Sequence, residues 1–281
     1  MSTGSELIAA QGAAHNEPAV VFEPEARMQV REGVAAIELN RPARGNALSA
    51  PMVEALIGCV QQACADPTVH TLAFGGAGRH FCTGFDIGDI DAASEGDLLL
   101  RLIRIETLLD TVWRAPIRTV AVANGRAWGA GADLFAACDL RIAAASASFR
   151  FPGAAFGVVL GTRRLAERVG TERARTWVGT GMTLDAVSAA AAGLASRVIA
   201  AADPDEALDW RVEAAVDAPL ALDRETLAAI RAASRPAGGP GGDALADADL
   251  AALVRAASRP GLKARILAYR ARSRAAASRP A

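Results

Sequence analysis

The stretch that decides the fold runs from Asn124 to Asp133 and reads Asn-Gly-Arg-Ala-Trp-Gly-Ala-Gly-Ala-Asp. An apolar run at 117–123 precedes it, which predicts a strand that ends in an Asn-Gly turn. Small residues follow, and a helix-like run occupies 134–138. Backbone amides at a helix start lack intrahelical acceptors and carry partial positive charge, which suits a developing oxyanion. The same small residues would also occur if the helix only needed to pack closely against its neighbours.

A second stretch repeats this pattern. Residues 69–74 predict a strand, and a Gly-Gly-Ala-Gly loop at 75–78 leads into Arg-His-Phe-Cys-Thr-Gly-Phe-Asp-Ile at 79–87. Here too a strand runs into a Gly-rich loop that opens a helix. Two such loops could place two backbone donors around one carbonyl oxygen.

Further motifs accompany the two loops: Asn-Arg-Pro at 40–42, Asn-Ala-Leu-Ser at 46–49, Ala-Cys-Asp-Leu-Arg-Ile-Ala at 137–143, and Gly-Leu with Arg-Val-Ile between 193 and 199. In this order they resemble the enoyl-CoA hydratase/isomerase (crotonase) superfamily over roughly residues 20–275. The resemblance implies an α/β fold, a crotonase-like spiral of ββα units with a helical C-terminal region. It divides the chain into a disordered tail at 1–18, a crotonase core at 19–200, and a helical region at 201–281 that serves trimerisation and the CoA pocket.

Composition narrows the class of protein. Hydrophobic residues make up 52% of the chain, enough for a large core, and a net charge of −1 gives no reason to expect nucleic acid as a partner. The four cysteines form no CxxC pair and the three histidines are scattered, so no metal site is expected. No apolar run reaches membrane-spanning length, which argues against a membrane partner. Free cysteines fit a reduced compartment, and we expect a cytoplasmic protein.

Alternating strands and helices predict a largely parallel α/β core. Strands are expected at 34–39, 69–74, 117–123 and 140–143, and helices at 50–60 behind an N-cap at Ser49, at 98–112 and at 131–138. Beyond Gly157 the chain is expected to be mostly helical. Thr162 and Thr171 are expected as N-caps, Gly170 as a C-cap, and further helices are expected at 183–193 and 262–274.

The resemblance assigns the two oxyanion donors to the backbone amides of Phe85 and Ala130. Their task would be to hold a thioester carbonyl while negative charge builds on its oxygen. Substrate contacts are expected from the neighbouring Gly84 and Gly129. Trp128 could line the acyl pocket, although packing in the core would explain it equally well.

Arg44 lies where family members often have a basic residue near the start of the CoA pocket, and it could also be an ordinary surface arginine. The resemblance implies no separate cofactor, since coenzyme A arrives as part of the substrate. It implies a homotrimer or a dimer of trimers.

The acid–base groups depart from the family pattern. Family hydratases carry two glutamates, and the first matches Asp133. The second would follow the Phe-Arg-Phe-Pro stretch at 149–152, where this chain has Gly153. Two carboxylates allow one to activate water and the other to protonate carbon. A single aspartate, one methylene shorter than glutamate, argues against simple hydration of enoyl-CoA as the reaction. Asp133 could alternatively serve only the helix dipole.

We therefore expect an acyl-CoA lyase or isomerase that stabilises a thioester enolate, with Asp133, Phe85 and Ala130 as its catalytic groups. Isomerisation, decarboxylation, dehalogenation and C–C cleavage remain open, as does the acyl group. An alternative is a non-catalytic homologue that binds CoA esters. A third possibility, an oligomeric scaffold without a ligand, predicts no affinity for CoA.

Overall fold

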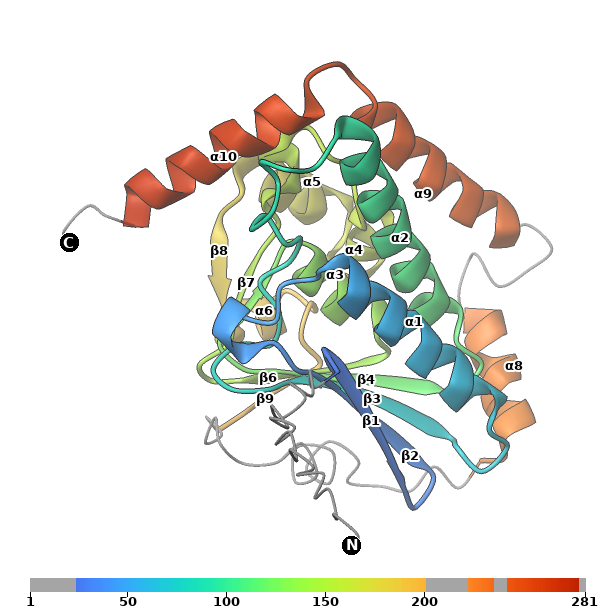
Figure 1. Ribbon diagram of the computed structural model, residues 1–281. Helices are drawn as coiled ribbons and strands as arrows, with labels where there is room; N and C mark the ends of the chain where they lie inside the picture. The colour runs from blue at the N-terminus through green and yellow to red at the C-terminus, as the bar shows by residue number, and fades with distance from the viewer. Residues whose placement is uncertain (1–23, 201–221, 235–241, 278–281) are drawn as a thin grey trace, which may run out of the picture.

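The computed structural model describes residues 24–200, 222–234 and 242–277 (Figure 1). The predicted tail at 1–18 lies outside the described residues. No helix in these described ranges is both long enough and apolar enough to cross a bilayer.

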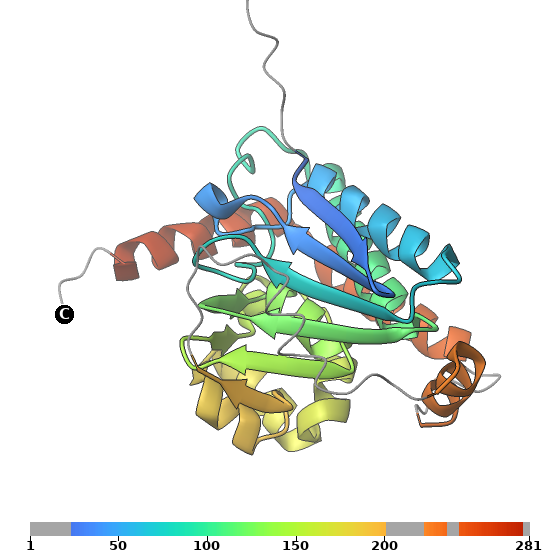
Figure 2. The ribbon, with the colours of Figure 1, turned by 90° about the horizontal axis from the view of Figure 1, so that it is seen from below.

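The main sheet has six strands in the order β1-β2-β3-β4-β6-β9, and Figure 2 shows them side by side. Its strands are β1 (Ala26–Arg31), β2 (Val34–Leu39), β3 (Thr71–Gly76), β4 (Arg118–Ala123), β6 (Leu140–Ala144) and β9 (Arg197–Ile199). Only the β1–β2 pair among these is antiparallel; the others pair in parallel. The parallel core and its four predicted strands are thereby confirmed, whereas β1 was not predicted from the sequence.

Three helices cover one face of this sheet: α1 (Ala50–Ala65), α2 (Glu95–Arg114) and α3 (Ala130–Ala137) (Figure 1). The predicted N-cap of α1 is confirmed, because Ser49 Oγ accepts a hydrogen bond from the amide of Met52 at 3.1 Å. Met52, Leu56 and Val60 repeat every four residues and are fully buried. The periodicity that predicted the helix is therefore the face that packs into the core.

A smaller sheet of three strands stands beside the main one. Its strands are β5 (Arg126–Trp128), β7 (Ser148–Arg150) and β8 (Thr183–Asp185). The helix predicted from Thr183 is wrong in its first turn, because Leu184 is buried and pairs with Phe149 across the sheet. Helix α6 (Ala186–Ala191) begins only after Asp185, whose side chain accepts a hydrogen bond from the amide of Ser188. A three-residue strand is too short to show in the sequence pattern.

Two predicted N-caps are also wrong by one residue. Thr162 and Thr171 are the first residues inside α4 (Thr162–Val169) and α5 (Thr171–Thr180), and the capping positions belong to Gly161 and Gly170. Neither cap makes a side-chain hydrogen bond, because glycine has no side chain. Gly170 also ends α4, as predicted.

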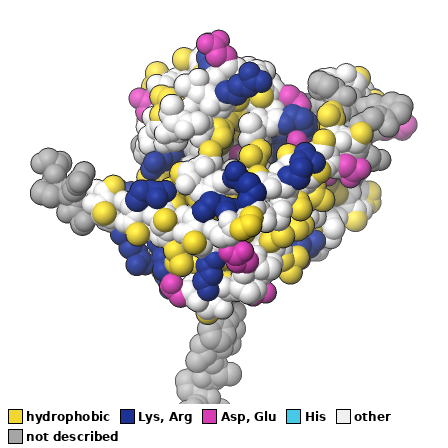
Figure 3. All heavy atoms as spheres, turned by 90° about the horizontal axis from the view of Figure 1, so that it is seen from above, with side chains coloured by type: hydrophobic (Ala, Val, Ile, Leu, Met, Phe, Trp, Pro, Cys, Tyr) yellow, Lys and Arg dark blue, Asp and Glu magenta, His cyan; other side chains and the backbone are white. Residues whose placement is uncertain are grey.

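The described part of the C-terminal region contains α8 (Arg224–Ser234), α9 (Gly242–Ala257) and α10 (Leu262–Ala277), with the last helix as predicted. A second hydrophobic core joins α9 and α10 to α2; its members include Leu98, Leu253 and Ile266. Helix α10 also packs on the short 3-10 helix η2 (Pro152–Phe156), with the rings of Phe156 and Tyr269 centred 5.2 Å apart. Lys and Arg side chains gather on the face that α10 presents (Figure 3).

A buried ion pair ties these layers together. Arg164 of α4 is fully buried, and its Nη2 donates to both carboxylate oxygens of Glu106 on α2, at 2.6 and 2.7 Å. Its Nη1 contacts Asp249 of α9 at 3.3 Å. The three helices are therefore joined by charge as well as by apolar packing.

Glu106→Gln should destabilise the fold strongly, because Arg164 keeps its charge in a dry interior and loses its two-oxygen partner. Breaking a buried pair from one side typically costs about 3–5 kcal/mol. Denaturant unfolding would measure this. Glu54→Gln is the control, since Glu54 pairs with Arg104 on the surface, with 53% of its side chain exposed, and should change stability little. Equally small losses in both variants would contradict the prediction.

Candidate active site

A cavity of about 1110 Å³ lies between the core and α10. Most of the predicted site residues line it: Arg44, Phe85, Trp128, Gly129, Ala130 and Asp133. Gly84 stands just behind the wall, between its neighbour Phe85 and the backbone of Trp128. The sequence motifs, far apart along the chain, therefore meet at one cavity.

Two backbone segments touch directly to form one wall. Cys82 donates its amide to Arg126 at 3.0 Å and accepts from the amide of Trp128 at 2.9 Å. A Cβ on Gly84 would come within 2.6 Å of the Trp128 carbonyl oxygen, and one on Gly131 within 2.3 Å of the Cys82 carbonyl oxygen. Both positions require glycine because backbone lies where a side chain would begin.

The two residues predicted to supply donor amides, Phe85 and Ala130, belong to this wall. The amide of Leu48 bonds to the carbonyl of Gly84 and the amide of Asp86 to the carbonyl of Leu48, so the amide of Phe85 points to the opposite side, where Cys82 meets β5. Ala130 is the first residue of α3, a position whose amide has no acceptor within the helix. A Cβ on Gly84 would lie 3.3 Å from the Ala130 nitrogen, which shows how near the two segments are.

Asp133 lies one turn further into α3 and is buried, with 6% of its surface exposed. Its Oδ1 has no hydrogen-bond partner in the described part of the chain, and Gly161 packs directly against the carboxyl group. Burial raises the pKa of Asp133 well above its ordinary value; nearby Arg164 lowers it in part and Glu106 raises it. The side chain is therefore disposed to hold a proton rather than to be charged.

Gly153 lies in η2 and also lines the cavity. A Cβ there would meet the Val158 carbonyl oxygen at 3.4 Å, an ordinary contact, so the position has room for a side chain. Among the described residues that line the cavity, only Asp86 and Asp133 are acidic. Asp86 is held in an ion pair with Arg41 at 2.9 Å, which leaves Asp133 as the acid without an ion pair or hydrogen bond at Oδ1.

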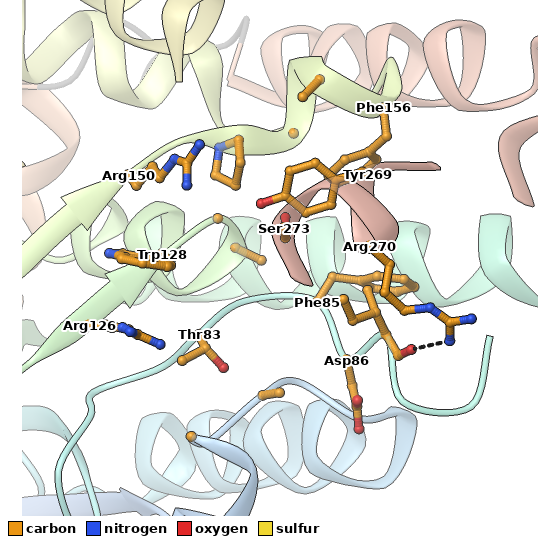
Figure 4. Close-up of a pocket in the computed structure, with 18 of the residues that line it drawn as sticks. Thr83, Phe85, Asp86, Arg126, Trp128, Arg150, Phe156, Tyr269, Arg270 and Ser273 are labelled. Atoms are coloured by element: carbon orange, nitrogen blue, oxygen red, sulfur yellow. Dashed lines mark hydrogen bonds between the residues drawn. The ribbon is translucent and has the colours of Figure 1, made fainter. Parts of the chain in front are cut away.

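The structure adds residues that the sequence did not single out (Figure 4). Arg126 and Arg150 line the cavity on either side of Trp128, with their Cζ atoms 4.5 and 5.8 Å from its ring. Tyr269 reaches the cavity from α10. Because side chains two residues apart on a strand share a side, the sequence could have indicated that Arg126 and Trp128 lie together. The approach of Arg150 and of α10 depends on tertiary structure. Trp128 itself is half-buried and faces the cavity rather than the core.

Comparison with known proteins gives the family. Residues 29–238 match the family model for enoyl-CoA hydratase/isomerase. A Mycobacterium leprae protein named "probable enoyl-CoA hydratase echA6" is 41% identical over 198 residues, which cover 68% of this chain and 76% of that protein. Among solved structures, an enoyl-CoA hydratase/isomerase of Xanthobacter autotrophicus Py2 is 28% identical, with a TM-score of 0.73, and the match covers 92% of this chain and 99% of that one. A Bordetella parapertussis structure titled with the same family name is 41% identical, with a TM-score of 0.79, over 92% of this chain and all of that one.

The geometry and the comparisons agree on a class of protein with a crotonase-like α/β fold. The chain belongs to the enoyl-CoA hydratase/isomerase family.

The raised pKa of Asp133 predicts a pH-dependent stability difference. Between the ordinary pKa of an aspartate and the raised value, the folded state keeps a proton that the unfolded state releases, so the free energy of unfolding falls as pH rises. Asparagine does not titrate. Asp133→Asn should therefore gain stability relative to wild type from acidic to neutral pH, as measured by denaturant unfolding.

Asp185→Asn provides the control with the opposite sign. Hydrogen bonds from Ser188 lower the pKa of Asp185, so its charged form stabilises the fold above its ordinary pKa. A stability difference between Asp133→Asn and wild type that stays constant with pH would show that Asp133 titrates normally.

Proposed function

We propose that this protein transforms acyl-CoA thioesters through an enolate whose oxygen is held by the backbone amides of Phe85 and Ala130. The observation that supports the proposal is that Phe85, Ala130 and the buried Asp133 all line one cavity, and that the first amide of α3 has no acceptor within its helix. Fixed donors aimed at a developing negative charge are among the largest contributions to catalysis, and losing one typically costs about 3–4 kcal/mol of barrier.

Asp133 is proposed as the acid–base group. A carboxyl group whose pKa is raised by burial keeps its proton to higher pH than an ordinary aspartate, which suits it to donate a proton to an enolate. Decarboxylation releases CO2 from a carboxylate and generates the enolate without prior removal of a proton, so it matches a protonated Asp133 better than hydration does. C–C cleavage, isomerisation and dehalogenation remain in the proposed range.

Recognition of coenzyme A is proposed to fall to Arg44 and to Arg272 and Arg274 of α10, which all line the cavity. Cations there suit the phosphates of the nucleotide end. We also retain the homotrimer or dimer of trimers and the cytoplasmic location as proposals from the family resemblance.

A second candidate is a protein that binds CoA esters without transforming them. Gly153 favours it, because the position that carries the second glutamate in family hydratases has no side chain. Both candidates predict binding of thioesters, and only the first predicts chemistry at the α-carbon.

Hydration of crotonyl-CoA should be very slow in the wild type, and Gly153→Glu should accelerate it. The position accepts a Cβ, and one acid–base group typically contributes about 10²–10⁴-fold. Loss of absorbance by the enoyl thioester measures the rate. Gly153→Gln has the same size without the charge and should stay slow. Wild-type turnover like that of ordinary hydratases would contradict the proposal.

Deuterium uptake into acetyl-CoA in heavy water tests the role of Asp133. Exchange at the α-carbon needs the carboxylate form, so after subtraction of the uncatalysed rate it should rise with pH through the raised pKa of Asp133. Asp133→Asn should bind acetyl-CoA normally and lose the exchange, because asparagine cannot accept the proton.

The outcomes separate the candidates. Exchange that persists in Asp133→Asn would remove that residue from the mechanism. Binding of acetyl-CoA, but not acetate, without any wild-type exchange would favour the non-catalytic binder. If calorimetry detects no binding of acetyl-CoA, the remaining candidate is an oligomeric scaffold without a ligand.

A further inference from the structure

The wall of the cavity formed by the small sheet carries a column of three side chains: Arg126, Trp128 and Arg150. Arg126 and Trp128 are two residues apart on β5, so their side chains point to the same side of the strand. Trp128 is in register with Arg150 on β7. Figure 4 shows the indole between the two guanidinium groups. A hydrogen bond from Trp128 Nε1 to Ser148 Oγ at 3.2 Å fixes the ring, and thereby the column.

The charges of this column are not neutralised by carboxylates. In the described part of the chain, neither Arg126 nor Arg150 makes a salt bridge, whereas Arg270 at the same cavity pairs with Asp91 at 2.8 Å. Arg150 is anchored through Nε, which donates to the Gly181 carbonyl at 2.7 Å, and this leaves its terminal nitrogens available. Arg126 is exposed.

The electrostatic potential near the column is positive. The pKa of His80, which also lines the cavity, is lowered by burial and further by the positive charges of Arg126 and Arg79. An anion entering this part of the cavity would be attracted by the same charges.

The column starts close to Ala130, the second proposed donor. Trp128 is two residues from Ala130, a span of at most about 7 Å. Arg150 is one strand away, about 4.8 Å. The phosphates of coenzyme A are separated from the thioester by the whole pantetheine arm. A carboxylate at the far end of a short acyl chain, by contrast, would approach the column, where a guanidinium group lies on either side of the indole.

We propose that Arg126 and Arg150, held in place by Trp128, form a carboxylate subsite, and that the substrate is the CoA thioester of a short dicarboxylic acid. This inference rests on the proposed function, since it assumes that a thioester occupies the cavity. A bidentate pair of charge-assisted hydrogen bonds from one guanidinium group, in the field of the second, would fix the acyl group and distinguish it from an uncharged chain of equal length.

Binding of matched thioesters by calorimetry tests the subsite. The pairs are succinyl-CoA with butyryl-CoA and glutaryl-CoA with valeryl-CoA, each equal in carbon number. Wild type should bind at least one dicarboxylic member roughly ten-fold more tightly than its neutral counterpart. Arg126→Gln and Arg150→Gln should abolish this preference and leave the affinity for the neutral thioester nearly unchanged.

Arg175→Gln is the matched control, because Arg175 is an exposed arginine of α5 outside the cavity, and it should keep the preference. Melting temperatures check folding, and if Arg150→Gln unfolds, the exposed Arg126 carries the test. Equal wild-type binding of both members in each pair overturns the proposal, as does a preference that survives in the variants. Equal weakening of neutral and dicarboxylic thioesters would also overturn it, by showing that the column binds coenzyme A itself. Failure of every thioester to bind would instead refute the proposed function.

Discussion

The direct backbone contact between residues 82–85 and 126–131 is the constraint on which the rest of the site depends. Carbonyl oxygens of Cys82 and Trp128 occupy the space where side chains of Gly131 and Gly84 would begin. This contact brings Phe85 close to the start of α3 at Ala130, and Ala130 and Asp133 of that helix line the cavity. A side chain at either glycine would push apart the two segments that hold the donors.

Ionisable side chains are buried behind this wall, and their burial costs free energy of folding. Asp133 and the Glu106–Arg164 pair lie close together in a largely dry interior. The ion pair is compensated by two short hydrogen bonds, whereas Asp133 Oδ1 has no partner in the described residues. A buried carboxyl oxygen without a hydrogen-bond partner is costly in the folded protein, and it is useful if the residue must transfer a proton at the cavity that it lines.

The opposite side of the cavity is built by the end of the chain. Helix α10 packs on η2 through Phe156 and Tyr269, and Arg265 donates to the Phe156 carbonyl at 3.0 Å. This places arginines of α10 across the cavity from the column of Arg126 and Arg150. Positive charge therefore lies on two walls of the cavity, and in the proposed function the two walls would bind different anionic parts of one thioester.

The sequence by itself determined those features that depend on local chemistry. Strands that run into Gly-rich loops, the Ser49 cap, the apolar repeat of α1 and the substitution of Gly153 for a carboxylate can all be recognised from neighbouring residues, and together they were enough to indicate the family. Tertiary structure decided what depends on partners distant in sequence. Leu184 lies in a strand because it pairs with Phe149. Trp128 faces a cavity because β5 pairs with β7, and Tyr269 reaches the same cavity because α10 packs back on η2. The pKa of Asp133 belongs to the same group, since burial by Gly161 and the field of Arg164 and Glu106 arise only when α2, α3 and α4 pack together.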